Sequence, residues 1–196
     1  MMQASETSKP GRFASIVVDT NVWLDYYLGF REGNQDACKL LAAANHAGVN
    51  LLCAVTTTKD LFYLIAANFK RDWRSRHVGQ LNEEGVAASH ATAWACLKNL
   101  KNIATAVGCD QSDVWLACAQ RPLHDDYEDN LVVAAAQRSR ADCLVTNDEK
   151  LLRHSPVATL SCRDAAIYLR AMADASLGNP GDRRREHPGS GMRRPK

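Results

Sequence analysis

Six acidic residues of this chain lie where a strand is predicted to end or a helix to begin. They come from four separate parts of the sequence and comprise Asp19, Asp60, Asp126, Glu128, Asp129 and Asp148. Carboxylates gathered from distant segments repel one another and raise each other's pKa unless a cation neutralises them. Mg²⁺ and Mn²⁺ favour such oxygen ligands and keep several waters for chemistry. The pattern therefore indicates a metal-dependent hydrolase.

Each acid taken singly also fits a structural role, because Asp and Asn commonly cap helices or open turns. Two strand ends, however, repeat the same set of side chains: Asp19-Thr20-Asn21 and Thr146-Asn147-Asp148. Each set combines a carboxylate, a hydroxyl and an amide at one place, which capping alone does not predict. We expect Thr20, Asn21 and Thr146 to orient the metal-binding carboxylates through hydrogen bonds.

The elements that must position these acids alternate along the chain. Short apolar runs predict strands at 15–18, 51–55, 103–107, 143–146 and 158–160. Between them, periodic apolar residues and capping signals predict helices, and the basic segment 70–77 is predicted to be a turn. This alternation is typical of an α/β fold with a mainly parallel central sheet between two helical layers. In such a sheet, ligands bind at the carboxyl edge of the strands.

Composition predicts one folded domain, residues 15–174, between a flexible stretch at 1–14 and a disordered basic tail at 175–196. The tail holds six Lys/Arg against two acids and few apolar groups. Seven cysteines, an odd number with no C-x-x-C spacing, indicate reduced thiols rather than a disulfide framework. The N-terminus resembles no signal peptide, and no apolar run approaches 18 residues. We therefore expect a soluble, cytoplasmic protein with no membrane contact.

Four segments together resemble the ordered motifs of the PIN-domain family, and within it the VapC-like ribonucleases, which include toxins of bacterial toxin–antitoxin pairs. The likeness extends from about residue 15 to 171. The segments are IVVDTNVWLDY at 16–26, TTTKDLFYLI at 56–65, DYEDNL at 126–131 and ADCLVTNDEKLL at 141–152.

The resemblance implies that Asp19, Asp129 and Asp148 bind the metal. Asp60 occupies the position at which the family usually has a glutamate, and its side chain is one methylene shorter. Asp60 could therefore contact the metal either directly or through a water molecule. Asp126 and Glu128 lie beside Asp129, and either could share its role. The expected catalytic set is therefore Asp19, Asp60, Asp126, Asp129 and Asp148, with Thr20 and Thr146 as supporting hydroxyls.

The sequence thus predicts a Mg²⁺- or Mn²⁺-dependent endoribonuclease that cleaves single-stranded or looped RNA. The resemblance adds the context of a type II toxin–antitoxin system, a cognate antitoxin protein as partner, and a homo-oligomer. The alternative is a non-catalytic PIN-like module that binds RNA or a protein. A phosphatase with an aspartyl nucleophile would want a second Asp at position 21, where this chain has Asn21. Lys59 and His124 are interpreted as solvated residues near the cleft, and the basic segment 70–77 as either a phosphate contact or an ordinary charged turn.

Overall fold

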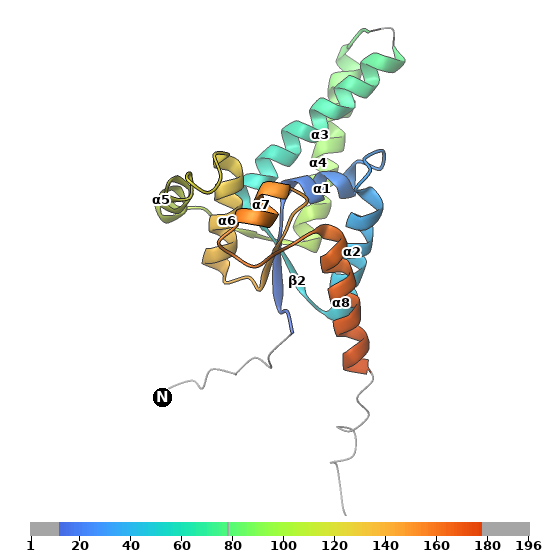
Figure 1. The fold of residues 1–196 in the computed structure, drawn as a ribbon. Coiled ribbons are helices and arrows are strands. Elements are labelled where there is room, and N and C mark those ends of the chain that lie inside the picture. The colour runs from blue at the N-terminus through green and yellow to red at the C-terminus, as the bar shows by residue number, and fades with distance from the viewer. Residues whose placement is uncertain (1–11, 78, 178–196) are drawn as a thin grey trace, which may run out of the picture.

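The computed structural model describes residues 12–77 and 79–177, and the chain folds around one five-stranded sheet (Figure 1). The strands are β1 (Ser15–Val18), β2 (Asn50–Ala54), β3 (Thr105–Val107), β4 (Cys143–Val145) and β5 (Thr159–Leu160). The helices are α1 (Thr20–Tyr27), α2 (Asn34–Ala47), α3 (Val55–Arg76), α4 (Glu83–Ile103), α5 (Gln111–Ala119), α6 (Tyr127–Ser139), α7 (Glu149–His154) and α8 (Cys162–Leu177).

The sheet is parallel throughout, with the strand order β3-β2-β1-β4-β5. From β1, the chain first builds outward through β2 and β3, and later returns to the other side of β1 to add β4 and β5. The order therefore reverses between β1 and β4. At such a switch point the loops leave the sheet in opposite directions and open a crevice at the carboxyl ends of the strands. The predicted three-layer α/β/α class is confirmed.

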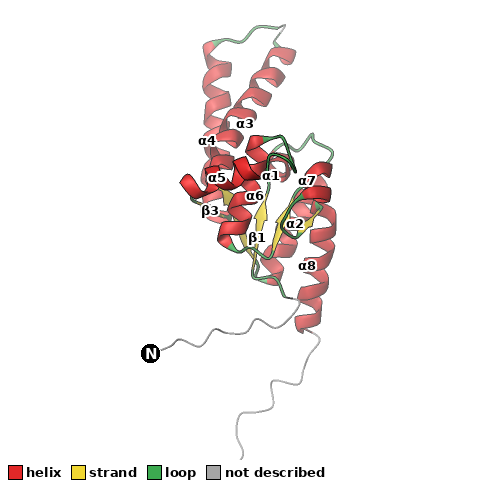
Figure 2. Ribbon diagram, turned by 60° about the vertical axis from the view of Figure 1, so that its left-hand side comes forward, coloured by secondary structure: helices red, strands yellow, loops and turns green. Residues whose placement is uncertain are grey.

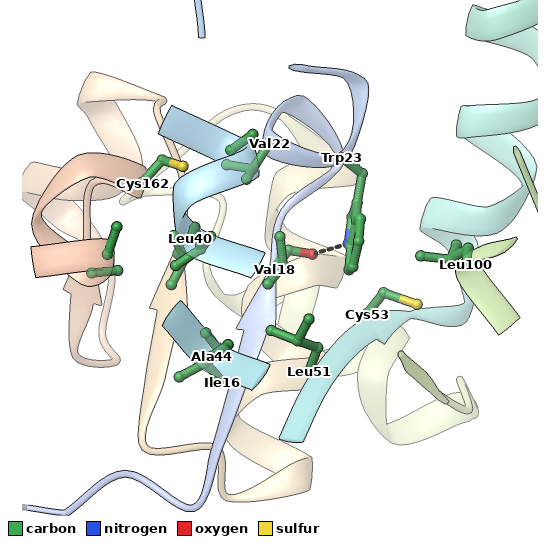
Figure 3. Close-up of a cluster of buried hydrophobic side chains, with 14 of the residues drawn as sticks. Ile16, Val18, Val22, Trp23, Leu40, Ala44, Leu51, Cys53, Leu100 and Cys162 are labelled. Atoms are coloured by element: carbon green, nitrogen blue, oxygen red, sulfur yellow. Dashed lines mark hydrogen bonds between the residues drawn. The ribbon is translucent and has the colours of Figure 1, made fainter. Parts of the chain in front are cut away.

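Helices cover both faces of the sheet (Figure 2), and alternating side chains of the strands supply one core to each face. Ile16 and Val18 point to a large core that is shared with α1, α2, α3, α4 and α8. Val17 points to a smaller core under α6 and α7. In the larger core the buried Trp23 donates its indole N–H to the carbonyl oxygen of Val18 at 3.0 Å (Figure 3). This bond fixes the start of α1 directly beyond the end of β1.

Helices α3 and α4 pack along each other and extend beyond the body of the domain as an arm (Figures 1 and 2). The prediction of a basic turn at 70–77 is wrong, because α3 continues to Arg76. The segment contains neither Gly nor Pro, and Trp73 packs against Gly85 of α4 so closely that an added Cβ would lie 2.7 Å from the indole ring. Contact with a second helix therefore stabilises a stretch that local sequence left ambiguous.

The C-terminal helix α8 reaches Leu177, so residues 175–177 are helical rather than part of the predicted tail. The remainder of that tail, 178–196, and most of the predicted flexible N-terminus, 1–11, lie outside the described residues. All seven cysteines are free, as expected. Among the helices that the structure describes, none combines the length and apolar character needed to cross a membrane.

Candidate metal centre

The three predicted metal ligands lie at the carboxyl edge of the sheet, beside the switch point between β1 and β4. Asp19 directly follows β1, and Asp148 lies three residues beyond β4. The two strand ends are tied together because the Asp19 amide donates to the carbonyl oxygen of Val145 at 3.0 Å. Asp129 enters from the opposite helical layer, in the first turn of α6. Distant parts of the sequence thus place carboxylates at one edge of the sheet.

The Asp19 carboxylate is 2% exposed and held by three hydrogen bonds. Its Oδ1 accepts the Thr20 amide at 2.6 Å, and its Oδ2 accepts the Asn21 side-chain amide at 2.7 Å and the Thr146 hydroxyl at 2.6 Å. Asn21 and Thr146 therefore contact this carboxylate in the way the sequence predicts. Thr20 contributes its backbone amide instead, since its hydroxyl bonds the hydroxyl of Thr57 at 3.1 Å.

Asp148 is linked to the same network through Thr146, whose Oγ1 accepts the Asp148 amide at 3.0 Å. Its side chain also caps α7, because Oδ1 accepts the backbone amides of Lys150 at 2.8 Å and Leu151 at 3.0 Å. The capping interpretation of this residue is therefore confirmed, and its metal-binding role stays a prediction. One carboxylate oxygen is used by the cap, and the other has no hydrogen-bond partner among the described residues.

Asp129 faces His124, a residue that sequence reasoning interpreted as solvated. That interpretation is wrong: His124 is 7% exposed, and its Nε2 lies 3.5 Å from Asp129 Oδ2 and 3.8 Å from Asp148 Oδ1. The candidate ligand atoms of His124, Asp129 and Asp148 all lie within 4.8 Å of one another. The only signal in the sequence is that His124 lies five residues before Asp129.

The remaining predicted acids divide into two kinds. Asp126 is exposed and caps α6, because its Oδ1 accepts the Glu128 amide at 2.9 Å. Asp60 lies on α3 with its side chain largely buried, and one oxygen lies 3.1 Å from the ammonium group of Lys59. Glu128 is half-buried; burial raises its pKa most, followed by the charge of Asp60. The structure therefore brings Asp60 together with Glu128, whereas Asp126 serves the helix end.

Burial and mutual repulsion make this crevice unfavourable for charged carboxylates. Burial raises the pKa of Asp19 to about 7, opposed by the Thr146 hydrogen bond and reinforced by the charge of Asp129. Burial, followed by the charge of Asp126, raises the pKa of Asp129 to about 6. Among the described residues, no Lys or Arg forms an ion pair with Asp19, Asp129 or Asp148. Carboxylate oxygens whose negative charge no cationic side chain neutralises are suitable ligands for a hard divalent cation.

A family model described as a PIN domain matches residues 15–150. Among solved structures, the chain is similar to the crystal structure of VapBC2 from Rickettsia felis bound to a DNA fragment from their promoter. The TM-score is 0.51 at 13% sequence identity, and the similarity covers 75% of this chain and 98% of that chain. No curated protein matches the chain. The structural likeness shows the fold, and the family match, which spans well over half of the 196 residues, shows that the chain belongs to the PIN-domain family.

Proposed function

We propose that the protein is a Mg²⁺- or Mn²⁺-dependent endoribonuclease that cleaves single-stranded or looped RNA. One observation carries the proposal: Asp19, Asp129 and Asp148, from three separate elements, converge at the switch point without an arginine or lysine partner among the described residues. Structural acids are usually neutralised, whereas perturbed carboxylates in a crevice are typical of functional sites. PIN-domain membership favours nuclease chemistry for the same site.

The residues fit a divalent ion by the chemistry of their donors. Asp19, Asp129 and Asp148 would hold it, and oxygen ligands suit Mg²⁺ and Mn²⁺. When bound, such an ion supplies an activated water for phosphodiester hydrolysis and compensates charge on the leaving oxygen. Asn21 and Thr146 hold the Asp19 carboxylate in one orientation. Glu128, beside Asp60, lies close enough to Asp19 to raise its pKa.

The arm supports an RNA substrate. One face of α3 continues away from Asp60 with the exposed ring of Tyr63 and then with Arg71 and Arg74. At about 100° per residue, these three side chains lie within about 60° of the direction of Asp60 around the helix. Arg71 and Arg74 form no ion pair with any residue that the structure describes. An exposed aromatic ring can stack on bases, and free guanidinium groups can contact phosphates, without requiring a duplex.

The biological setting in this proposal is a toxin–antitoxin pair. The sequence motifs resemble VapC-like toxins, and one structural neighbour is VapBC2 of Rickettsia felis, solved bound to DNA from the promoter. A cognate antitoxin would then bind the protein and block the crevice. The homo-oligomeric state and the cytoplasmic location belong to the same proposal, since they follow from the resemblance.

The test is cleavage of matched substrates by the purified full-length protein. Single-stranded RNA, the same RNA in a duplex, and single-stranded DNA are incubated with Mg²⁺, Mn²⁺ or EDTA. We expect cleavage of single-stranded RNA alone, abolished by EDTA and by Asp129→Asn. Lys150→Ala, which changes a charge near the same crevice without removing a ligand, serves as the matched control and should retain cleavage. RNA binding without cleavage in either metal would instead support the non-catalytic alternative, and equal cleavage of the duplex would contradict the substrate assignment.

A further inference from the structure

We propose that His124 is a positioning residue. Its Nε2 proton points toward Asp129 Oδ2 and Asp148 Oδ1 and so fixes the orientation in which both carboxylates bind a cation. This inference rests on the proposed function, because it assumes that the two carboxylates bind metal. The family motifs in the sequence do not include His124, and no chemistry assigned above uses it. Its burial in an otherwise exposed loop is what requires an explanation.

Three hydrogen bonds fix the backbone and the ring of His124. The His124 amide donates to the carbonyl oxygen of Gln120 at 3.1 Å, and the His124 carbonyl accepts the side-chain amide of the buried Asn130 at 2.8 Å. The ring itself accepts the backbone amide of Asp126 on Nδ1 at 3.2 Å. Residues on both sides, Leu123 and Asp125, are exposed. The loop is therefore held so that one imidazole turns inward.

The Asp126 amide also determines where the ring carries its proton. An N–H group donates only to a lone pair, so Nδ1 must be the unprotonated nitrogen, and the neutral ring carries its proton on Nε2. That Nε2 is buried, has no hydrogen-bond partner, and faces Asp129 Oδ2 and Asp148 Oδ1. A buried donor without a partner is energetically costly and rare in native proteins. Its placement between two carboxylates indicates a role there.

The same geometry argues against direct metal ligation by the ring. To bind a cation, Nε2 would need its lone pair, and the proton would move to Nδ1, where it would face the N–H group of Asp126. The donor interpretation avoids this conflict. It also leaves Asp129 Oδ1 and Asp148 Oδ2, which have no hydrogen-bond partner among the described residues, for a cation. His124 thus acts through the two carboxylates and not on the metal.

Two substitutions of His124 distinguish the role of Nε2 from the role of Nδ1. The amide nitrogen of Gln can occupy the place of Nε2, whereas Asn reaches only the place of Nδ1. We expect His124→Asn to weaken Mn²⁺ binding about tenfold, the scale on which partners of metal ligands act. We expect His124→Gln to stay within about threefold of the wild type, because it restores the donor. His154→Asn, at the exposed C-terminal end of α7, is the matched control and should leave Mn²⁺ affinity unchanged.

Mn²⁺ affinity is measured by calorimetry on the full chain without RNA, and kcat and KM are measured separately on RNA. Loss of the ordered carboxylates should lower kcat at limiting Mn²⁺ and leave the KM for RNA unchanged. Nitrogen-15 NMR of the wild type gives a readout that needs no variant, and we expect the tautomer protonated at Nε2. A ring protonated at Nδ1, or equal losses in the Asn and Gln variants, would overturn the proposal.

The remaining outcomes distinguish this inference from the proposed function. If His124→Asn loses Zn²⁺ or Co²⁺ binding far more than Mg²⁺ binding, the ring is a ligand and the positioning role is wrong. Unchanged Mn²⁺ affinity in His124→Asn also overturns it. If Mn²⁺ binding shows the expected pattern but no RNA is cleaved, only the proposed function fails. A wild-type protein that does not bind Mn²⁺ contradicts both.

Discussion

Two acidic clusters in this molecule each contain one buried aspartate but differ in what neutralises its charge. Asp113 of α5 is 2% exposed and hydrogen-bonds the Arg138 guanidinium, which also lies 3.0 Å from Asp110. Asp19, equally buried at 2%, has only the neutral donors Thr20, Asn21 and Thr146. The first cluster joins α5 to α6, and the second lies at the edge of the sheet.

The difference separates acids whose charge is neutralised by an arginine from an acid that has only neutral hydrogen-bond donors, as the proposed metal site requires. A buried carboxylate beside a guanidinium is compensated within the chain, whereas one without a cationic partner raises its pKa instead. Asp25 follows the first pattern, since Arg31 Nε lies 2.5 Å from its carboxylate. Of the three buried aspartates in the described part of the chain, Asp19 alone lacks an arginine. Burial by itself therefore does not distinguish Asp19 from the other two aspartates, whereas the missing arginine does, and this is the feature on which the proposed role of Asp19 rests.

The largest expected effect comes from Asp19→Asn. The change keeps the volume and removes one negative ligand, so we expect RNA cleavage to fall about 100-fold or more, as when a group that stabilises transition-state charge is lost. Removing a buried carboxylate should leave the free energy of unfolding without metal unchanged or higher. Cleavage rates and urea unfolding in EDTA measure the two effects. If the variant cleaves at the wild-type rate, Asp19 is not required for activity, and the proposed functional difference between the two clusters is wrong.

Arg138→Ala should produce the opposite pattern. It leaves the buried Asp113 carboxylate without its cation, which we expect to lower the free energy of unfolding by about 2 kcal/mol, less than for a fully buried pair because Arg138 is partly exposed. Metal binding at the sheet edge should be retained in the folded variant. Arg153→Ala breaks an exposed pair with Glu149 and is the control, expected to change stability by less than about 0.5 kcal/mol. Comparable losses in both variants would contradict a structural role for the Arg138 cluster.

The pH dependence should sharpen the comparison further. Burial raises the folded-state pKa of Asp19 to about 7, so its protonated form stabilises the metal-free protein at low pH, and this contribution is lost as pH rises from about 4 to about 7. Mn²⁺ must displace that proton, so its affinity should fall about tenfold per pH unit below 7. Urea unfolding in EDTA and Mn²⁺ titrations at pH 5 to 8 test both. In Asp19→Asn the slope of stability between about pH 6 and pH 7 should disappear, whereas Asp129, whose pKa is raised to about 6, still contributes at lower pH. A slope that persists above about pH 6 would assign it to another group.

The acids at the start of α6 should differ in what their loss affects. The sequence analysis places Asp126, and not Glu128, in the expected catalytic set. The contacts instead favour a larger effect of Glu128 on activity, because Asp126 caps the helix while Glu128 lies beside Asp60 and close to Asp19. We expect Glu128→Gln to lower cleavage about tenfold, and Asp126→Ala mainly to lower stability by about 1 kcal/mol. Cleavage rates measure the effect on activity, and thermal melts measure the effect on stability. A larger activity loss in the Asp126 variant would instead support Asp126 as the catalytic residue of the two.

The smallest effect is expected on the arm. Replacing both Arg71 and Arg74 by Ala should weaken RNA binding severalfold and reduce its salt dependence, because two phosphate contacts are lost. The cleavage rate at saturating RNA should not change, since both residues are remote from the carboxylates. Arg76→Ala is the control, because Arg76 is paired with Asp72 at 3.0 Å and projects from another face of α3. Binding of RNA over a range of salt concentrations measures the effect, and equal losses in the control would remove the specific role of this face.

The parallel α/β architecture and the placement of Asp19 and Asp148 at the same edge of the sheet could be predicted from the sequence. Both depend on local signals: short apolar strands that end in polar residues, and helical patterns between them. Once the strands are parallel, their carboxyl ends must lie at one edge, so acids at those ends meet without any further information. The contacts of Asn21 and Thr146 with Asp19 follow from the same geometry.

What only the tertiary structure decided depends on contacts between residues that local signals do not connect. His124 is buried because Asn130 and the Asp126 amide hold its loop inward, and a lone histidine in a loop carries no sign of this. Helix α3 continues through a charged segment because Trp73 packs against Gly85 of α4. The fate of each buried acid depends on whether a distant arginine reaches it, as Arg138 reaches Asp113 across 25 positions. Local patterns determine where carboxylates enter the fold, and packing determines which of them remain uncompensated.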